Sequence, residues 1–127
     1  MDDPSSEAVD LAHMLFDLAR GGQGEQLSAY VDAGAPVDLT DPAGNTLLML
    51  AAYHGHAATV GELARRGADV DRLNDRGQSP LAGAVFKGEA DVVAVLLEHG
   101  ADPDAGRPTA RETAVMFGRP DLLPDGS

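Results

Sequence analysis

The chain has 127 residues, of which 43% are hydrophobic and none is cysteine, and its formal net charge is −12 at pH 7. These values are typical of one modest globular domain, and they exclude disulfides, thiolate nucleophiles and thiolate zinc sites. The negative charge repels phosphate backbones and anionic bilayers, so it disfavours nucleic-acid and membrane partners and favours a cationic or largely neutral partner or a small molecule.

The first segment, residues 1–10, reads MDDPSSEAVD. It is acidic, and it lacks the basic region and the apolar stretch of a signal peptide. The longest apolar run in the chain is also far shorter than the roughly 20 residues that a membrane-spanning helix needs. We therefore expect a cytoplasmic protein.

The middle of the chain consists of two consecutive copies of one unit. Residues 41–73 read DPAGNTLLMLAAYHGHAATVGELARRGADVDRL, and residues 74–106 read NDRGQSPLAGAVFKGEADVVAVLLEHGADPDAG. Eleven of the aligned positions are identical. A repeat of this length indicates an array of stacked supersecondary units.

Each unit predicts two short helices. Thr46 and Ser79 stand at N-cap positions, and Pro80 follows at the first helical position. Small and aliphatic residues then recur at spacings of three and four, until Gly55 or Gly88 ends the first helix in the left-handed conformation. A second helix with valine and leucine on one face follows in each unit. The alanines of the first helix let neighbouring units approach closely.

Two weaker copies flank the central pair. Residues 8–40 keep several leucine, alanine and glycine positions in a degraded form, and residues 105–123 fit again after a hairpin shortened by three residues. The last copy has room for barely one turn of its second helix before Pro124. We expect the outer copies to cap the array and the C-terminal end to be its less stable end.

These features resemble the ankyrin repeat, whose pattern is a turn with D-x-x-G-x-T-P-L, an inner helix with A-A-x-x-G-H, an outer helix with V-x-x-L-L and a hairpin with G-A-D-x-N. The resemblance covers most of the chain. It implies an all-α solenoid of stacked helix-turn-helix units with short hairpin loops, as a single domain over residues 1–127 with repeats at approximately 8–40, 41–73, 74–106 and 107–123. The histidine that commonly follows T-P-L is replaced by Met49 and by Ala82, so its hydrogen-bond network is expected to be absent.

The repeat pattern also sorts the histidines of the stretch AAYHGH, residues 51–56. His56 occupies a position where ankyrin repeats usually carry histidine, so a structural role is expected for it. Tyr53 and His54 occupy the two variable positions that end the inner helix and face the concave groove in the family. The two histidines therefore point in different directions, and no metal site is expected.

The same variable positions in the other repeats carry Arg20 and Gly21, Phe86 and Lys87, and Met116 and Phe117. Three of the five aromatic residues of the chain, Tyr53, Phe86 and Phe117, therefore fall on this one face. Aromatic side chains dominate binding hot spots, so the face is predicted to bind a partner. The alternative is that the rings pack on one another and shield the inner helices.

Other candidate sites are weaker. The Asp-x-Asp pairs at 69–71 and 102–104 lack the glycine and glutamate spacing of an EF-hand, and ankyrin hairpins carry such pairs anyway. The stretch GGQGEQ at 21–26 lacks the strand, lysine and hydroxyl residue of a phosphate loop, and no nucleophile motif occurs. His13 is expected to cap or pack, and His99 to end an outer helix.

The favoured function is a protein-protein interaction module, monomeric and without cofactor or metal, that binds a protein partner in its concave groove. The alternative is a small-molecule-binding protein or a small acid/base enzyme for dehydration, isomerisation or cyclisation in the same groove, with Tyr53, His54 and Lys87 as acid, base and electrostatic stabiliser. In that case Ala82 and Gly83 would deepen the pocket. The predicted binding residues are Arg20, Asn45, Tyr53, His54, Asp75, Arg76, Gln78, Phe86, Lys87, Met116 and Phe117.

Overall fold

The computed structural model describes residues 4–123, and the predicted stop at Pro124 lies outside this range. The helices in chain order are α1 (Pro4–Arg20), α2 (Gly24–Asp32), α3 (Leu47–Tyr53), α4 (Ala57–Arg65), α5 (Pro80–Lys87), α6 (Ala90–Glu98) and α7 (Ala110–Met116), followed by a short 3-10 helix, η1 (Pro120–Leu122). Within the described residues no helix is both long and apolar enough to cross a membrane.

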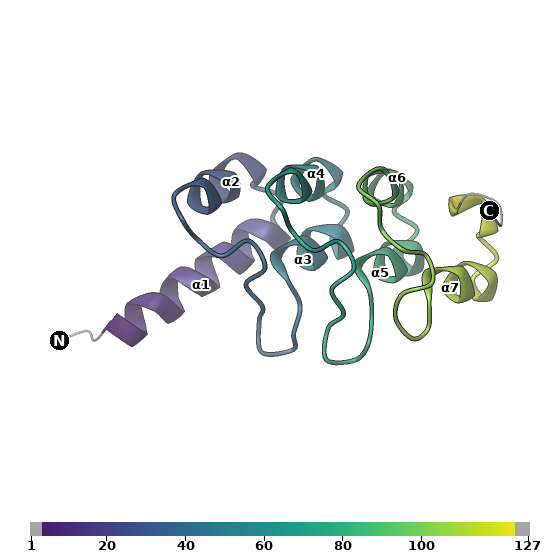
Figure 1. The fold of residues 1–127 in the computed structure, drawn as a ribbon, viewed down its shortest axis with the longest axis horizontal. Helices are drawn as coiled ribbons and strands as arrows, with labels where there is room; N and C mark the ends of the chain where they lie inside the picture. Colours follow the sequence, from purple (N-terminus) through teal and green to yellow (C-terminus); the bar gives the residue numbers. More distant parts are fainter. Residues whose placement is uncertain (1–3, 124–127) are drawn as a thin grey trace.

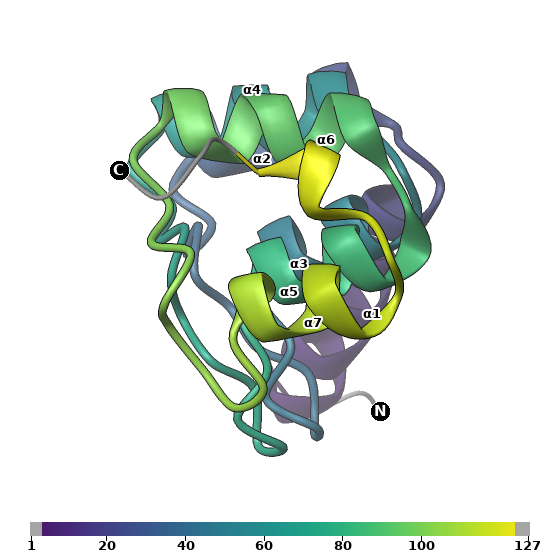
Figure 2. The same ribbon diagram turned by 90° about the vertical axis from the view of Figure 1, so that its right-hand side faces the viewer.

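The helices form two parallel layers that run along the length of the molecule (Figure 1). One layer holds α1, α3, α5 and α7, and each of these helices packs against the next. The other holds α2, α4 and α6, again packed in sequence, and an end-on view shows it stacked above the first layer (Figure 2). The predicted all-α solenoid of helix pairs is therefore confirmed.

Side-chain caps fix where the inner helices begin. The hydroxyl of Thr46 accepts a hydrogen bond from the backbone N–H of Met49 at 3.1 Å, and the hydroxyl of Ser79 accepts one from Ala82 at 3.0 Å. Thr109 begins α7 with a full capping box, in which Glu112 also accepts a hydrogen bond from the Thr109 N–H. These bonds satisfy helix N–H groups that have no partner within the helix. The predicted N-caps at Thr46 and Ser79 are confirmed.

The core lies between neighbouring repeats and between the two layers. Ala51 and Ala84 are fully buried on α3 and α5, where small side chains let the inner helices approach closely. Leu63 and Leu96 of the outer helices are also fully buried and fill the space between the layers. The alanines of the inner helices and the leucines of the outer helices, which recur from repeat to repeat in the sequence, are therefore the residues that form the core.

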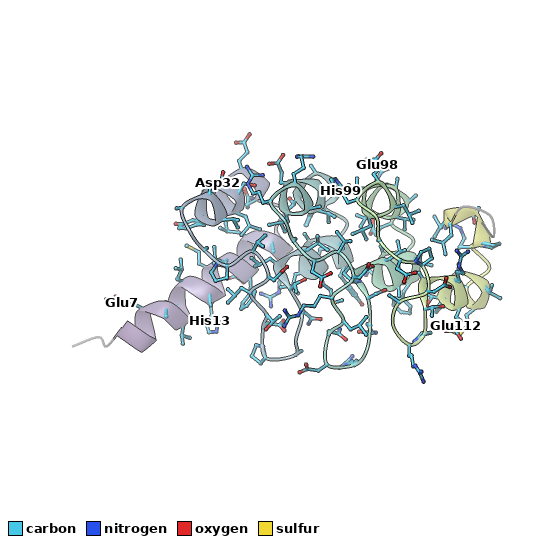
Figure 3. All side chains as sticks on the ribbon, in the orientation of Figure 1. Glu7, His13, Asp32, Glu98, His99 and Glu112 are labelled. Atoms are coloured by element: carbon cyan, nitrogen blue, oxygen red, sulfur yellow. The ribbon has the colours of Figure 1, made fainter. Side chains whose placement is uncertain are left out.

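The first helix departs from the expected repeat, because α1 runs for 17 residues from Pro4 instead of forming a short helix. No glycine occurs between Pro4 and Arg20, and proline is favoured at the first position of a helix, so nothing in this segment interrupts it. His13 consequently lies in the middle of α1 with its side chain exposed (Figure 3), and the expectation that it caps or packs was wrong.

The long loops between the layers lie side by side and bond to one another. The backbone N–H of Asp75 donates to the carbonyl of Ala43 at 3.0 Å, and that of Arg107 donates to Gly77 at 2.9 Å. The backbone N–H groups of Asp69 and Asp102 donate to carboxylates one repeat earlier, at 3.0 and 2.8 Å. The loops therefore form a continuous edge along the inner layer instead of separate flexible fingers.

Arg66 links two helices of the outer layer. Its guanidinium donates to Asp32 of α2 at 2.9 and 3.2 Å and to Glu62 of α4 at 2.8 Å. The hydrogen bond from Arg66 lowers the pKa of Asp32, and hydrogen bonds from Arg65 and Arg66 lower the pKa of Glu62. Each carboxylate is therefore more acidic in the folded chain than in an unfolded one.

Candidate functional site

A groove of about 560 Å³ lies between the inner helix layer and the edge formed by the loops. Helices α3, α5 and α7 supply one wall, and the loops that precede α3, α5 and α7 supply the other. The lining residues are Ala43, Asn45, Met49, Leu50, Tyr53, His54, Asn74, Arg76, Gln78, Ser79, Pro80, Ala82, Gly83, Phe86, Pro108, Thr113, Met116 and Phe117.

Three aromatic rings on the helix wall of the groove are exposed, and each comes from a different repeat. The exposed fractions are 38% for Tyr53, 53% for Phe86 and 52% for Phe117. Phe86 and Phe117 also meet edge to face, with ring centroids 5.1 Å apart. Two of the rings thus pack on one another, as the alternative interpretation expected, and yet each leaves half of its surface open to a ligand.

Tyr53, His54 and Lys87 come together at one end of the groove. The rings of Tyr53 and His54 are nearly perpendicular with centroids 5.8 Å apart, and the Nζ of Lys87 lies over the Tyr53 ring, 5.0 Å from its centroid. A cation over an aromatic face is attracted by the negative face of the ring. Lys87 itself does not line the groove but lies at its edge, held against a residue that does.

The polar wall of the groove is organised by Asn74, a residue that the sequence analysis did not select. Its side-chain amide donates to Asn45 and to Gln78, both at 2.9 Å, and its side-chain oxygen accepts from the backbone N–H groups of Arg76 and Gln78, both at 3.0 Å. Asp41 has the same role one repeat earlier, where it accepts the N–H groups of Ala43 and Asn45. The equivalence of Asp41 and Asn74 in consecutive repeats is the signal that could have identified Asn74.

Three predicted binding residues do not line the groove: Lys87, which lies at its edge, and Arg20 and Asp75. Arg20, at the end of α1, pairs with Asp17 at 3.1 Å and is not part of the lining, because the groove begins only at α3. The carboxylate of Asp75 lies against Gly44 of the preceding loop and is not part of the lining either. Asn45, Tyr53, His54, Arg76, Gln78, Phe86, Met116 and Phe117 do line the groove, as do Ala82 and Gly83 of its floor.

His56 faces away from this site. Its Nε2 lies 2.7 Å from the backbone carbonyl of Arg20, and its ring lies against Gly22, so it ties the second repeat to the end of the first inner helix. Among the described residues no three His, Asp or Glu side chains come together in an arrangement that could hold a metal ion. The charged residues Asp32 and Glu98, together with His99, lie on the outer layer, remote from the groove (Figure 3).

The chain is similar to known proteins that contain repeats of this kind. The family described as ankyrin repeats, in three copies, matches residues 15–107. A protein of Pseudomonas aeruginosa that is named as a putative ankyrin repeat protein is 48% identical over 54 residues. The matched stretch covers 42% of this chain and 32% of that protein, so the chain spans well under half of the relative's length.

Proposed function

Because the chain belongs to the ankyrin-repeat family, whose members generally mediate protein interactions, we propose that it binds a protein partner in the groove of α3, α5 and α7. One observation carries this proposal. Tyr53, Phe86 and Phe117 are exposed on successive repeats, in a chain that has only five aromatic residues, of which Phe16 alone is buried.

The surroundings of these rings favour tight binding. The opposite wall is already ordered by the hydrogen bonds of Asn74, and the rings project from short capped helices. A surface that is ordered before binding loses little conformational entropy when a partner arrives. Large aromatic side chains supply most of the free energy of binding at such surfaces.

The experiment compares affinity purification from the native cell with wild-type and variant baits. Tyr53→Ala and Phe86→Ala should weaken partner binding by about 2 kcal/mol or more, as truncated hot-spot aromatics do. Both side chains are exposed, so the free energy of unfolding should change little. Glu98→Ala, on the opposite layer, is the matched control and should leave binding unchanged.

Gly83→Leu provides an independent check, since Gly83 lines the groove and a Cβ there would meet no atom within 4 Å. The larger side chain should occupy the groove while the helix stays intact. A partner that binds all of these variants as well as it binds the wild type would show that the groove is not the interaction surface.

A second candidate function is recognition or conversion of a small molecule in the same groove. The observation that favours it is the convergence of Tyr53, His54 and Lys87 beside a volume that is within the range of small-molecule pockets. His54→Ala separates the two functions. It should abolish turnover while the ligand still binds if His54 is a general acid or base, and it should only weaken partner binding modestly if the groove is an interaction surface.

A cytoplasmic location and a monomeric state fit this function and stay predictions from the sequence. Analytical ultracentrifugation tests the second, since a monomer requires a sedimenting mass of 13.1 kDa.

A further inference from the structure

The groove differs in charge from the rest of the molecule. The chain has 21 acidic residues and 9 basic ones, yet among the described residues that line the groove none is Asp or Glu. The lining contains one arginine, Arg76, and one histidine, His54, and Lys87 lies at its edge over the Tyr53 ring. The groove is therefore an apolar surface that carries positive charge inside an acidic protein.

Arg76 and Lys87 also lack an acidic partner within the part of the chain that the structure describes. The salt bridges there use five of the nine basic side chains, namely Arg20, Arg65, Arg66, Arg111 and Arg119. Acidic groups outnumber basic ones more than twofold, so most cations have found a carboxylate. Four basic side chains form no salt bridge among the described residues, namely Arg72, Arg76, Lys87 and Arg107, and of these Arg76 lines the groove and Lys87 lies at its edge.

Two carboxylates on the adjoining elements are already engaged in hydrogen bonds. Asp41 accepts three hydrogen bonds from its own loop, and Glu112 accepts the N–H of Thr109 in the capping box of α7. Asp75 lies against Gly44 of the preceding loop. None of these groups forms a salt bridge with Arg76, so its guanidinium is available to a ligand.

We propose that the segment bound in this groove is an acidic peptide, in which Asp or Glu residues alternate with large apolar side chains. The apolar side chains would pack against Phe86, Met116 and Phe117, and the carboxylates would pair with Arg76 and Lys87. Arginine suits this role because its planar fork binds a carboxylate with two hydrogen bonds. The proposal rests on the function proposed above and specifies the chemistry of its partner.

The net charge of the protein argued for a cationic or neutral partner, but local charge decides binding in the groove. At physiological ionic strength charges more than about 8 Å apart are largely screened, so the acidic outer layer acts weakly on a ligand held between the inner helices and the loops. A direct contact with an unpaired cation is screened much less. The long-range repulsion slows the encounter with an acidic ligand and does not prevent its binding.

A displayed library of random peptides, selected in parallel on several forms of the full chain, tests the proposal. The forms are the wild type, Arg76→Glu, the Tyr53→Ala/Phe86→Ala double variant and Arg72→Glu. Arg72 is exposed, forms no salt bridge among the described residues and does not line the groove, so its reversal is the matched control for charge. A fluorescent synthetic copy of the most enriched peptide then gives dissociation constants by polarisation.

The wild type should enrich peptides in which Asp and Glu outnumber Lys and Arg and which carry an aromatic or long aliphatic residue. Their affinity should fall about tenfold or more in Arg76→Glu and stay within about twofold in Arg72→Glu. Enriched peptides that are neutral or basic, but still need Tyr53 and Phe86, would overturn the acidic partner and leave the interaction function standing. An acidic peptide that binds equally well after Arg76→Glu would also overturn it. If no peptide depends on Tyr53 and Phe86, the proposed function fails together with this inference.

Discussion

Substitution of alanine for glycine should have opposite effects on the free energy of unfolding at two positions, Gly83 within α5 and Gly88 at its C-terminal end. Gly83 lies inside the helix, and a Cβ built on it meets no atom within 4 Å, so the methyl group causes no clash. Alanine loses less backbone entropy than glycine on folding into a helix, which stabilises a protein by about 0.5–1 kcal/mol. Gly83→Ala should therefore raise the free energy of unfolding by this amount.

Gly88 ends the same helix with φ +70°, in the left-handed region. A Cβ there would meet only the guanidinium of Arg119 at 3.8 Å, an ordinary contact, so any cost comes from the backbone alone. An L-residue with a side chain pays about 1–2 kcal/mol for this conformation. Gly88→Ala should accordingly lower the free energy of unfolding by about 1 kcal/mol or more.

Urea denaturation followed by far-ultraviolet circular dichroism measures both changes, with the slope m as a check that the unfolding transition itself is unaltered. The midpoints of the two variants should move in opposite directions from the wild type. In thermal melts of a chain of this size the shifts should be roughly 2–6 °C upward for Gly83→Ala and of similar or larger size downward for Gly88→Ala. Midpoints that move in the same direction would contradict the assigned helix boundary, because the argument depends on Gly83 lying within α5 and Gly88 beyond it.

Three further substitutions test other parts of the fold. Ala84→Leu should destabilise the protein by about 1–3 kcal/mol because Ala84 is fully buried between inner helices, whereas Ala94→Leu on the exposed face of α6 should change stability by less than about 0.5 kcal/mol; equal melting temperatures would disprove the packing. Thr109→Ala removes the capping box of α7 and should lower the stability of that helix by about 1 kcal/mol, which would be measured as faster amide hydrogen exchange in α7. Unchanged exchange rates would show that the cap contributes nothing. Arg66→Gln should destabilise the protein at neutral pH and progressively less below about pH 4. The two carboxylates bound to Arg66 have lowered pKa values when folded, so their contribution is present above the ordinary values of 3.8 and 4.5 and is lost as the pH falls through the folded-state values. A stability difference between wild type and variant that does not depend on pH would refute this linkage.

Much of the fold could be predicted because each repeat carries its own local instructions. Thr46 and Ser79 begin their helices through bonds to N–H groups three residues away, and Gly88 ends one through its own backbone. None of these effects needs a distant part of the chain. The constant repeat length then implies that like helices lie side by side, and so the burial of Ala51 and Ala84 followed from the sequence.

The length of the first helix was not predicted from the repeat pattern. Leucine and alanine positions matched the later repeats, but the segment lacks the turn that begins their inner helices, and α1 extends to Pro4 as a result. The sequence contained this information in the absence of any glycine up to Arg20. Because the segment was aligned with the short inner helices of the central repeats, neither the length of α1 nor the exposure of His13 was predicted.

The sequence by itself determined where the helices of the two central repeats begin and end, since these boundaries depend on short-range bonding, and its resemblance to the ankyrin repeat implied the face on which Tyr53, Phe86 and Phe117 lie. Only the tertiary structure decided which of the polar residues on that face take part in one site. Asn74 orders the loop wall through its hydrogen bonds, and Lys87, which belongs to the repeat after that of Tyr53, lies over the Tyr53 ring. Arg20 forms a salt bridge with Asp17 on its own helix and does not line the groove. The physical reason is that a long polar side chain takes the partner that is nearest in space, and that partner belongs either to another repeat or to its own helix. Periodicity fixes the spacing of the backbones and leaves this choice open.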